Sequence, residues 1–329
     1  MIDNYNRKIN YLRISVTDRC NLRCQYCRPK EGLSLLGHED ILSYEEILRI
    51  VSVATELGIT KVRVTGGEPL IRRGIIDFVR ELSSISGLKD ISLTTNGLLL
   101  GEYAAPLYEA GIRRINISID SLKEKKYAAI TGGGDFRVLW QGIEAALKEG
   151  FYPIKLNTVV IKGVNDDEIL DFAALSLKYP FQMRFIELMP IGQAGIQYEH
   201  RFLSNDILWE RINRTYSLEP VDRGTETDGP ARIFRIPGGM GEIGFISPIS
   251  HHFCNACNRI RLTSDGHFRP CLLKDREIDL KTMLRRGCSD RELKEVLLGA
   301  ISAKPQKHEI DPSENQVKKC VKEMVSLGG

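Results

Sequence analysis

The chain has 329 residues, of which 42% are hydrophobic and 27% are charged, a balance typical of a globular protein rather than a disordered one. Its 46 basic and 43 acidic side chains leave a formal net charge of +3, which disfavours a strongly basic nucleic-acid-binding protein. No apolar run approaches the roughly 20 residues of a membrane helix, and the first residues lack the charged and apolar regions of a signal peptide. We therefore expect a cytoplasmic protein with neither nucleic acid nor membrane as a partner.

From residue 11 to about 190, short strands rich in Val, Ile, Leu or Thr alternate with amphipathic helices. The predicted strands are residues 11–16, 61–65, 91–95, 113–119, 154–161 and 183–188. Six βα units in succession predict a parallel sheet. Because a complete TIM barrel has eight units, we expect an open, partial (βα)6 TIM-like barrel in preference to a flat doubly wound sheet. In either fold, functional groups collect at the carboxyl ends of the strands.

The best-defined helix begins after Ser43, whose hydroxyl predicts a capping box with Glu46. Apolar residues then recur at helical spacing, and Gly58 suits the left-handed stop at the end of this helix. The same start signal predicts two further helices, at Ser121…Glu124 and Asn165…Glu168.

The pattern changes after about residue 190. A helix is predicted near 204–213, short antiparallel strands within 232–247, and two helices within 279–302. Ser264-Asp265-Gly266 predicts a hairpin turn between 259–263 and 267–272. We therefore predict two domains, a barrel over residues 1–190 and a C-terminal α+β domain over residues 191–329.

Six of the eight cysteines fall into two triplets more than two hundred residues apart. One reads C-x3-C-x2-C and the other C-x2-C-x13-C, whereas Cys288 and Cys320 are isolated. The triplets are Cys20, Cys24 and Cys27, and Cys254, Cys257 and Cys271. In a reducing cytoplasm such cysteines are thiols or metal ligands rather than disulfides.

Three thiolates leave a metal site one ligand short. Structural zinc takes four ligands, and His251 and His252 offer a fourth for the second triplet, whereas no histidine lies close to the first before His38. A [4Fe–4S] cube also takes four ligands, so three cysteines leave one iron open to a non-protein ligand. We expect two such clusters, each chelated by a small molecule, and zinc at the second triplet remains the alternative.

The loop after the first strand, Asp18-Arg19-Cys20-Asn21-Leu22-Arg23-Cys24-Gln25-Tyr26-Cys27, resembles the signature of the radical S-adenosylmethionine (SAM) superfamily. This resemblance implies a [4Fe–4S] cluster on the first triplet, with the amino and carboxylate groups of SAM on its open iron. It also implies that the reduced cluster cleaves SAM to a 5′-deoxyadenosyl radical. The SAM contacts implied in the same way are Tyr26, Gly67 of the Gly66-Gly67-Glu68-Pro69 segment, Ser118 and Met189.

The second triplet, in the run Cys254-Asn255-Ala256-Cys257-Asn258-Arg259-Ile260-Arg261-Leu262-Thr263 with Cys271 beyond it, resembles the auxiliary-cluster segment of the GTP 3′,8-cyclase family of molybdenum cofactor biosynthesis. The terminal Gly-Gly agrees with that family. The resemblance implies a radical SAM lyase with a second [4Fe–4S] cluster, whose open iron holds the guanine of GTP. It implies that the adenosyl radical removes the ribose C3′ hydrogen, that C3′ attacks guanine C8, and that the product is (8S)-3′,8-cyclo-7,8-dihydro-GTP.

Arginine is suited to bidentate contacts with phosphate, so basic residues are expected around a triphosphate. Arg13 and Arg63 lie within predicted strands, where an unpaired buried charge is costly, and Arg259 and Arg261 share one face of a strand. Their alternative is a paired or solvated surface position. The residues that the resemblance assigns to GTP are Arg13, Arg63, Thr94, Lys155, Arg259, Ile260 and Arg261, and those assigned to catalysis are Arg13, Arg259, Arg261, Gly328 and Gly329.

Two other functions remain open at this point. A radical SAM enzyme that modifies a peptide also carries auxiliary clusters, but usually with more cysteines. A zinc-binding RNA or DNA adaptor is disfavoured by the near-neutral charge and the lack of an aromatic–basic stripe. For the cyclase, the family resemblance implies a reducing electron donor, a downstream cyclic pyranopterin monophosphate synthase as partner, and a homodimer.

Overall fold

The computed structural model describes residues 1–29, 32, 34–196, 198–222, 229–310, 320 and 322–328. Within these residues one sheet runs in the order β12-β11-β10-β1-β2-β3-β4-β5-β6-β9-β8-β7. The strands are β1 (Tyr11–Ser15), β2 (Lys61–Thr65), β3 (Asp90–Thr95), β4 (Arg114–Ser118), β5 (Ile154–Val160), β6 (Phe181–Glu187), β7 (Glu219–Pro220), β8 (Arg232–Arg235), β9 (Glu242–Ile246), β10 (Arg259–Leu262), β11 (His267–Arg269) and β12 (Ile278–Asp279).

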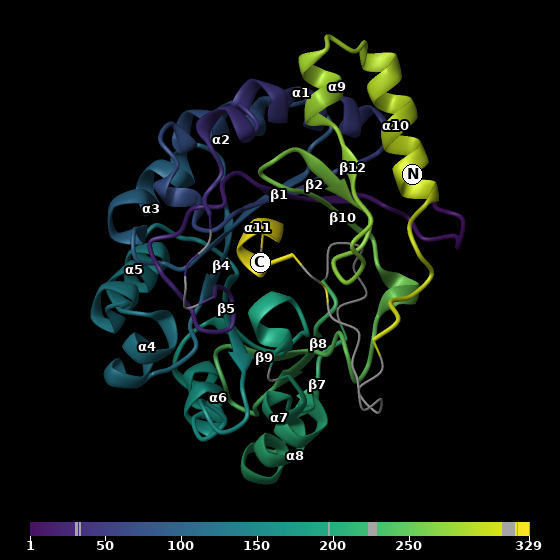
Figure 1. The fold of residues 1–329 in the computed structure, drawn as a ribbon. Coiled ribbons are helices and arrows are strands. Elements are labelled where there is room, and N and C mark those ends of the chain that lie inside the picture. The colour runs from purple at the N-terminus through teal and green to yellow at the C-terminus, as the bar shows by residue number, and fades with distance from the viewer. Residues whose placement is uncertain are drawn as a thin grey trace.

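The six predicted strands form β1 to β6 and pair in parallel, as expected. The C-terminal segment extends this parallel core at both edges, because β10 pairs in parallel with β1 and β9 pairs in parallel with β6. Antiparallel hairpins then cover the two new edges, β10–β11–β12 on one side and β9–β8–β7 on the other. The result is an open barrel of eight parallel strands with short protected edges (Figure 1).

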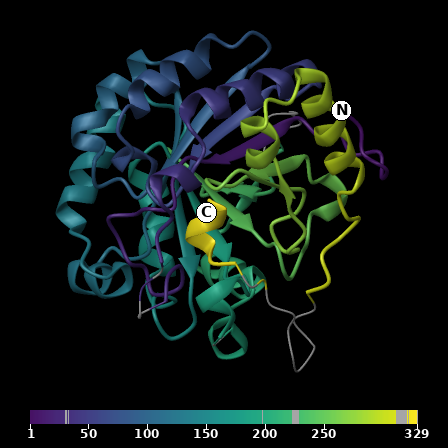
Figure 2. The ribbon, with the colours of Figure 1, turned by 45° about the horizontal axis from the view of Figure 1, so that its top comes forward.

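Helices cover the outer side of this sheet, and the short C-terminal helix α11 lies inside the arc of strands (Figure 1, Figure 2). The helices that follow the barrel strands are α1 (Tyr44–Glu56), α2 (Ile75–Ser84), α3 (Leu100–Glu109), α4 (Glu124–Thr131), α5 (Phe136–Lys148) and α6 (Ile169–Lys178). The remaining helices are α7 (Tyr198–Arg201), α8 (Asn205–Tyr216), α9 (Lys281–Arg285), α10 (Asp290–Ser302) and α11 (Met324–Leu327). The described residues include no helix long and apolar enough to cross a membrane.

Side chains on the central strands alternate between two environments. Leu12 and Ile14 of β1, like Ile260 and Leu262 of β10, are buried in the core between the sheet and its helices. Their neighbours Arg13 and Arg261 instead face the inner side of the barrel and line its cavity. Since successive side chains of a strand point to opposite faces, each strand contributes to both the core and the cavity.

The capping box predicted for α1 is confirmed, since Ser43 Oγ accepts from the Glu46 amide and Glu46 accepts from the Ser43 amide. The hairpin turn at Ser264-Asp265-Gly266 is also confirmed, with β10 and β11 antiparallel and Gly266 at φ +80°. A positive φ of this kind suits glycine.

The two further helices are present as α4 and α6, but Ser121 and Asn165 do not cap them, because these side chains have other partners. Ser121 Oγ and the Leu122 amide both donate to the buried carboxylate of Glu168, at 2.9 and 2.7 Å. Asn165 Nδ2 donates to the carbonyls of Asp120 and Val159, both at 2.9 Å. These hydrogen bonds tie the loop after β4 to the loop after β5, and neither α4 nor α6 has a side-chain cap.

The predicted division at residue 190 stays a prediction. The chain changes character there, but β9 and β10 join the sheet that β1 to β6 begin. The C-terminal segment thus shares both the sheet and the core with the N-terminal one.

We predict that Glu168→Ala lowers the free energy of unfolding by about 2 kcal/mol, because it leaves the Leu122 amide and the Ser121 hydroxyl without their acceptor. Asp167→Ala is the matched control, since the neighbouring Asp167 pairs only with lysines at the surface and we expect a loss below about 1 kcal/mol. Urea unfolding of the metal-free protein measures both. Equal losses would contradict the structural role given to Glu168.

Candidate functional site

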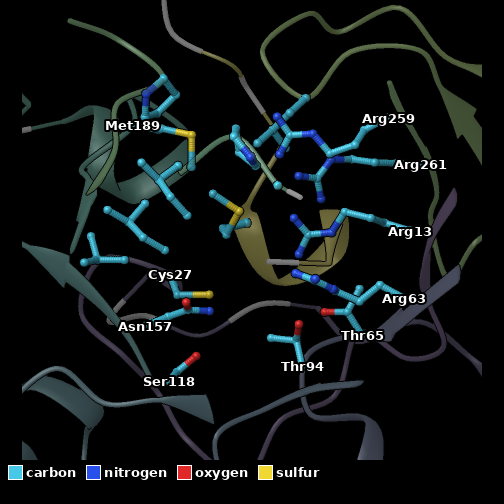
Figure 3. A pocket seen from close by; sticks show the side chains of 18 of the residues that line it. Arg13, Cys27, Arg63, Thr65, Thr94, Ser118, Asn157, Met189, Arg259 and Arg261 are labelled. Atoms are coloured by element: carbon cyan, nitrogen blue, oxygen red, sulfur yellow. The ribbon is translucent and has the colours of Figure 1, made fainter. Parts of the chain in front are cut away.

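One cavity of about 320 Å³ lies on the inner side of the barrel and contains both cysteine triplets in its lining. All eight parallel strands contribute to it, as do the loops after β1 and β9 and the helix α11. The first triplet follows β1 and lies at the carboxyl ends of the barrel strands, where parallel α/β folds collect functional groups, whereas Cys254 and Cys257 precede β10, which is parallel to β1, and so lie at the opposite, amino ends. Figure 3 shows Arg13, Arg63, Arg259 and Arg261 entering the cavity from one side, with Cys27, Ser118 and Met189 across from them.

The loop that carries the first triplet is fixed from several sides. Leu22 N contacts Cys20 Sγ at 3.4 Å, and Cys27 N donates to the Cys24 carbonyl at 2.9 Å, which makes a tight turn. Gly67 packs directly under this loop, because a Cβ at that position would lie 2.1 Å from the Arg19 carbonyl oxygen. Position 67 thus requires glycine because its backbone packs against the cysteine loop. This requirement is separate from the predicted contact of Gly67 with SAM.

Tyr26, between the last two cysteines of that loop, is anchored by a buried carboxylate. Its hydroxyl donates to Asp120 Oδ2 at 2.6 Å, and Asp120 Oδ1 accepts from the Val159 amide at 2.9 Å. Burial raises the pKa of Asp120 to about 6 against the lowering effect of these bonds. The arrangement connects the cysteine loop to the ends of β4 and β5.

The second triplet lies in a different electrostatic environment. Burial alone would raise the pKa of Cys257, but the nearby cations of Arg259 and Lys304 outweigh it and lower the pKa to about 6. In the first triplet, burial and the neighbouring thiolates raise the pKa values of Cys24 and Cys27. The pKa of Cys254, in the second triplet, is raised by burial and by its neighbouring thiolates. Since a thiolate must be formed before it can bind metal, Cys257 is the cysteine whose surroundings most favour metal binding.

Both triplets fit a [4Fe–4S] cluster. The cysteines of each triplet lie near enough to raise one another's pKa by repulsion between thiolates. In the described part of the chain no three cysteine, histidine or carboxylate side chains converge on the position of one metal ion. In a [4Fe–4S] cube each thiolate binds a different iron, so three cysteines that do not meet at one point can hold it. His251 bonds Asp206 at 2.7 Å instead, and neither His251 nor His252 lines the cavity.

The basic residues of the cavity stand side by side because the strands are in register. Arg13 of β1 is paired with Arg261 of β10 on one side and with Arg63 of β2 on the other. Across the sheet, Asn157 of β5 is paired with Ser118 of β4 and with Arg184 of β6. The inner face of the sheet thus presents three adjacent guanidinium groups on β10, β1 and β2. On β4, β5 and β6 it presents a second row, in which Ser118 and Asn157 are followed by the guanidinium group of Arg184.

This crowding shows in the pKa values of the cations. Burial and then repulsion from Arg63 and Arg259 lower the pKa of Arg13 to about 10, although Tyr11 opposes the shift. Burial and then repulsion from Arg184, with further cations beyond it, lower the pKa of Lys155 to about 5. Like charges held together in a buried cavity destabilise the empty protein and make the cavity a site for a polyanion.

Two buried polar atoms in the cavity point to a polar ligand as well. Thr94 Oγ1 and Asn157 Oδ1 have no hydrogen-bond partner among the described residues. Buried polar groups of folded proteins are normally paired, so these atoms are left for a bound molecule. Ser118, Met189, Tyr26 and Gly67, the residues predicted to contact SAM, line the same cavity.

Among the residues of the cavity wall that sequence reasoning missed are Tyr11, Lys61, Asn157 and Arg184. Tyr11 and Lys61 lie two positions before Arg13 and Arg63, so the two-residue period of a strand places them on the same face. Asn157 follows Lys155 by the same rule. Alternation around these known positions is the signal that would have found them.

Ile260 was predicted as a GTP contact, but the structure places its side chain in the core, with 1% of its surface exposed. It lies between Arg259 and Arg261, so strand alternation turns it to the outer face. Gly328 does lie at the site, where its carbonyl accepts from Arg261 Nη1 at 2.6 Å. A Cβ on Gly328 would lie 2.7 Å from Thr65 Cγ2 at φ +72°, so a larger residue does not fit there. Gly329 lies outside the described residues.

The C-terminal tail is attached at several points before it reaches the cavity. Cys320 forms a parallel bridge with Ile191, and Lys322 pairs with Glu277 at 2.8 Å and with Asp265 at 3.3 Å. Glu323 accepts from the Gln193 amide at 3.1 Å. These contacts hold α11, whose Met324 and Val325 form part of the cavity wall.

Comparisons with known proteins agree with this arrangement. Residues 14–175 match the radical SAM superfamily, and residues 181–310 match the family described as Molybdenum Cofactor Synthesis C. The chain is 52% identical to the GTP 3′,8-cyclase of Moorella thermoacetica over 94% of its length and 96% of that protein. It is 49% identical to the GTP 3′,8-cyclase of Alkaliphilus metalliredigens over the full length of both. The chain belongs to the GTP 3′,8-cyclase family.

A solved structure from outside this family has a similar fold. SuiB of Streptococcus suis, crystallised with S-adenosylmethionine, superposes with a TM-score of 0.56 over 90% of this chain and 68% of that one, at 15% identity. The open barrel and its C-terminal extension thus occur beyond the GTP 3′,8-cyclase family. Two [4Fe–4S] clusters and SAM are the cofactors of this chain, and the six cysteines described above are the residues that fit the clusters.

We predict that Lys155→Met stabilises the empty protein, and more so at low pH. The pKa of Lys155 is about 5 in the folded chain against an ordinary 10.5, so the folded chain binds fewer protons than the unfolded chain between these values. Stability due to this group therefore rises with pH across that window, and its full penalty is present below pH 5.

Urea unfolding of parent and variant at pH 6 and pH 9 measures this, with the exposed Lys125→Met as control. The advantage of Lys155→Met should be larger at pH 6 than at pH 9. A difference that does not change with pH would mean that Lys155 stays charged in the folded chain.

Proposed function

We propose that this protein is a GTP 3′,8-cyclase that converts GTP to (8S)-3′,8-cyclo-7,8-dihydroguanosine 5′-triphosphate. The observation that carries the proposal is the single cavity with a cysteine triplet at each end and a row of cations between them. A triphosphate supplies the negative charge that this row lacks. The reaction transfers the C3′ hydrogen of the ribose to the 5′-deoxyadenosyl radical and joins C3′ to C8 of guanine within one bound nucleotide. The guanine radical that results takes one electron from the reductant and one proton, which gives the 7,8-dihydro product.

At the end of the cavity formed by the loop after β1, Cys20, Cys24 and Cys27 would hold a [4Fe–4S] cluster. With SAM bound and the cluster reduced, this site supplies the 5′-deoxyadenosyl radical. Tyr26, Gly67, Ser118 and Met189 are the proposed SAM contacts, and their cavity positions support that role. Their part is to orient SAM toward the ribose, since the protein positions such cofactors while the cofactor carries the chemistry.

The cations between the two triplets are the proposed binding site for the triphosphate. Arg13, Arg63 and Lys155 are joined there by Lys61 and Arg184, which line the same wall. Guanidinium groups bind phosphate oxygens in pairs, so a row of them fixes the orientation of the chain of phosphates. A bound triphosphate also raises the pKa of Lys155 and favours its charged form. Thr94 adds a hydroxyl whose oxygen has no other partner among the described residues.

At the opposite end of the cavity, beside β10, Cys254, Cys257 and Cys271 would hold the second cluster, whose open iron would bind guanine. Arg259 and Arg261 stand on the inner face of β10 beside it, and Arg261 also donates to the Gly328 carbonyl. We propose that Arg259 and Arg261 act directly on the nucleotide and that Gly328 sets the position of Arg261. The apolar side chains of α11 next to them exclude water from the reacting atoms.

The proposal extends to partners that the family implies. These are a reducing electron donor, a downstream cyclic pyranopterin monophosphate synthase that takes the product, and a second copy of the chain in a homodimer. A cytoplasmic location accords with the need for reduced thiols at both triplets.

The test is an anaerobic assay with GTP, SAM and a reductant, with the nucleotide product identified by mass and NMR. We expect about eight irons per chain after reconstitution, formation of 5′-deoxyadenosine, and conversion of GTP to the 3′,8-cyclo product. Cys271→Ala should abolish cyclisation while SAM cleavage continues, because the first triplet is intact.

Cys288→Ala is the matched control, since Cys288 does not line the cavity, and it should keep full activity. Cyclisation by Cys271→Ala at the parent rate would remove the second cluster from the mechanism. SAM cleavage at equal rates with and without GTP would contradict GTP as the substrate.

A further inference from the structure

The short segment after α10, residues 304–308, contacts the second cysteine triplet at several points. His308 donates its backbone amide to the Cys254 thiol, and its ring Nε2 bonds the Pro248 carbonyl at 2.9 Å. Arg7 joins this segment to the triplet, because its Nη1 donates to the carbonyls of both Cys254 and Gln306, at 2.9 and 3.0 Å. The segment therefore lies against the ligand set without contributing a cysteine to it.

Lys304 makes the most direct of these contacts. Its ammonium donates to the carbonyl of Arg259 at 2.8 Å and to that of Pro270 at 2.6 Å. It also hydrogen-bonds the Cys257 thiolate. An ammonium has three donors, so all three are used. Two of the acceptors belong to the first loop: Cys257 itself and the carbonyl of Arg259, two residues after it. The third is the carbonyl of Pro270, directly before Cys271. One side chain therefore connects two of the three ligand positions.

Lys304 carries a buried charge that has no carboxylate to balance it. Its side chain lies in the wall of the cavity with 3% of the residue's surface exposed. Among the ion pairs of the described residues none includes Lys304. A buried ammonium is costly unless an anion lies close by. The thiolates of the second triplet are the anionic groups that it contacts, so its position is accounted for by the charge of a bound cluster.

We propose that Lys304 is a positioning residue of the second cluster: it holds the Cys257 and Cys271 loops at the spacing of the cube, and its charge raises the reduction potential of that cluster. Hydrogen bonds and nearby charge are the means by which proteins set the potential of iron–sulfur clusters. The inference rests on the second cluster proposed above, but not on GTP cyclisation.

The test uses the full chain with both clusters and the variant Lys304→Met, which keeps the length of the side chain and removes its charge and donors. Iron release to a ferrous chelator under anaerobic conditions should be about ten-fold faster for the iron of one cluster. The rate of iron release from the first cluster and the rate of reductive SAM cleavage should stay at parent values. The midpoint potential of the C-terminal cluster, followed by EPR in a Cys20→Ala, Cys24→Ala, Cys27→Ala background, should become more negative.

Lys281→Met is the control, because Lys281 also donates to a backbone carbonyl, that of Asp40, but lies outside the cavity wall. Circular dichroism of the metal-free chains shows whether each variant folds. If Lys304→Met does not fold, Lys304→Arg carries the test, since it keeps the charge but replaces the three-donor ammonium by a planar group, and its iron release should exceed that of Lys281→Met.

The inference is overturned if the folded variant releases iron at the rate of Lys281→Met and keeps the parent potential. A parent chain that binds only about four irons would instead contradict the second cluster itself. Iron counting on the parent thus separates a failure of the proposed function from a failure of this inference.

Discussion

The repulsion among cations on the inner face of the barrel is the constraint on which the site depends. Parallel register sets Arg261, Arg13 and Arg63 next to one another. Burial removes the water that would screen these charges, so the pKa values of Arg13 and Lys155 fall. The apolar outer faces of the same strands form the core, and the fold therefore holds the cations together at the expense of the stability of the empty protein. A polyanion bound in the cavity offsets this repulsion between cations, so binding of the substrate stabilises the folded protein.

The two ends of the cavity differ in a way that matches their proposed tasks. Around the first triplet, burial and Asp120 raise the thiol pKa values, and the loop is held by backbone and by the Tyr26–Asp120 bond. Around the second, Arg259 and Lys304 favour the thiolate at Cys257. A cluster beside cations is easier to reduce than one beside a carboxylate. The asymmetry thus lies in the residues that surround the cysteines rather than in the cysteines themselves.

Much of the barrel could be predicted from the sequence, because its strands and its first helix depend on local pattern. The six predicted strands and the Ser43–Glu46 capping box are present, and so is the hairpin at Gly266. The helices predicted after Ser121 and Asn165 are present too, but these two residues do not cap them, because partners more than forty residues away, Glu168 and Asp120, compete for the same side chains. The parallel pairing of β9 and β10 at the two edges of the sheet also depends on contacts across the whole chain.

The site divides in the same way. Both cysteine triplets and most of the cations were found from motifs and family resemblance, and the structure brings them to one cavity. A motif does not state which face of a strand a residue occupies, so the core position of the Ile260 side chain was not foreseen, and its contact with GTP stays a prediction. Lys304 carries no motif, and only its three acceptors, from 34 to 47 residues away along the chain, reveal it.

Proton uptake on binding of GTP tests the central claim most directly. If the cavity holds Lys155 neutral until a triphosphate enters, calorimetry near pH 7 in buffers of different ionisation enthalpy should show uptake of about one proton per GTP bound. Lys155→Met should bind without that uptake. A binding enthalpy that is the same in every buffer for the parent chain would contradict the account, because it would mean that the cations of the cavity are fully charged before the substrate arrives.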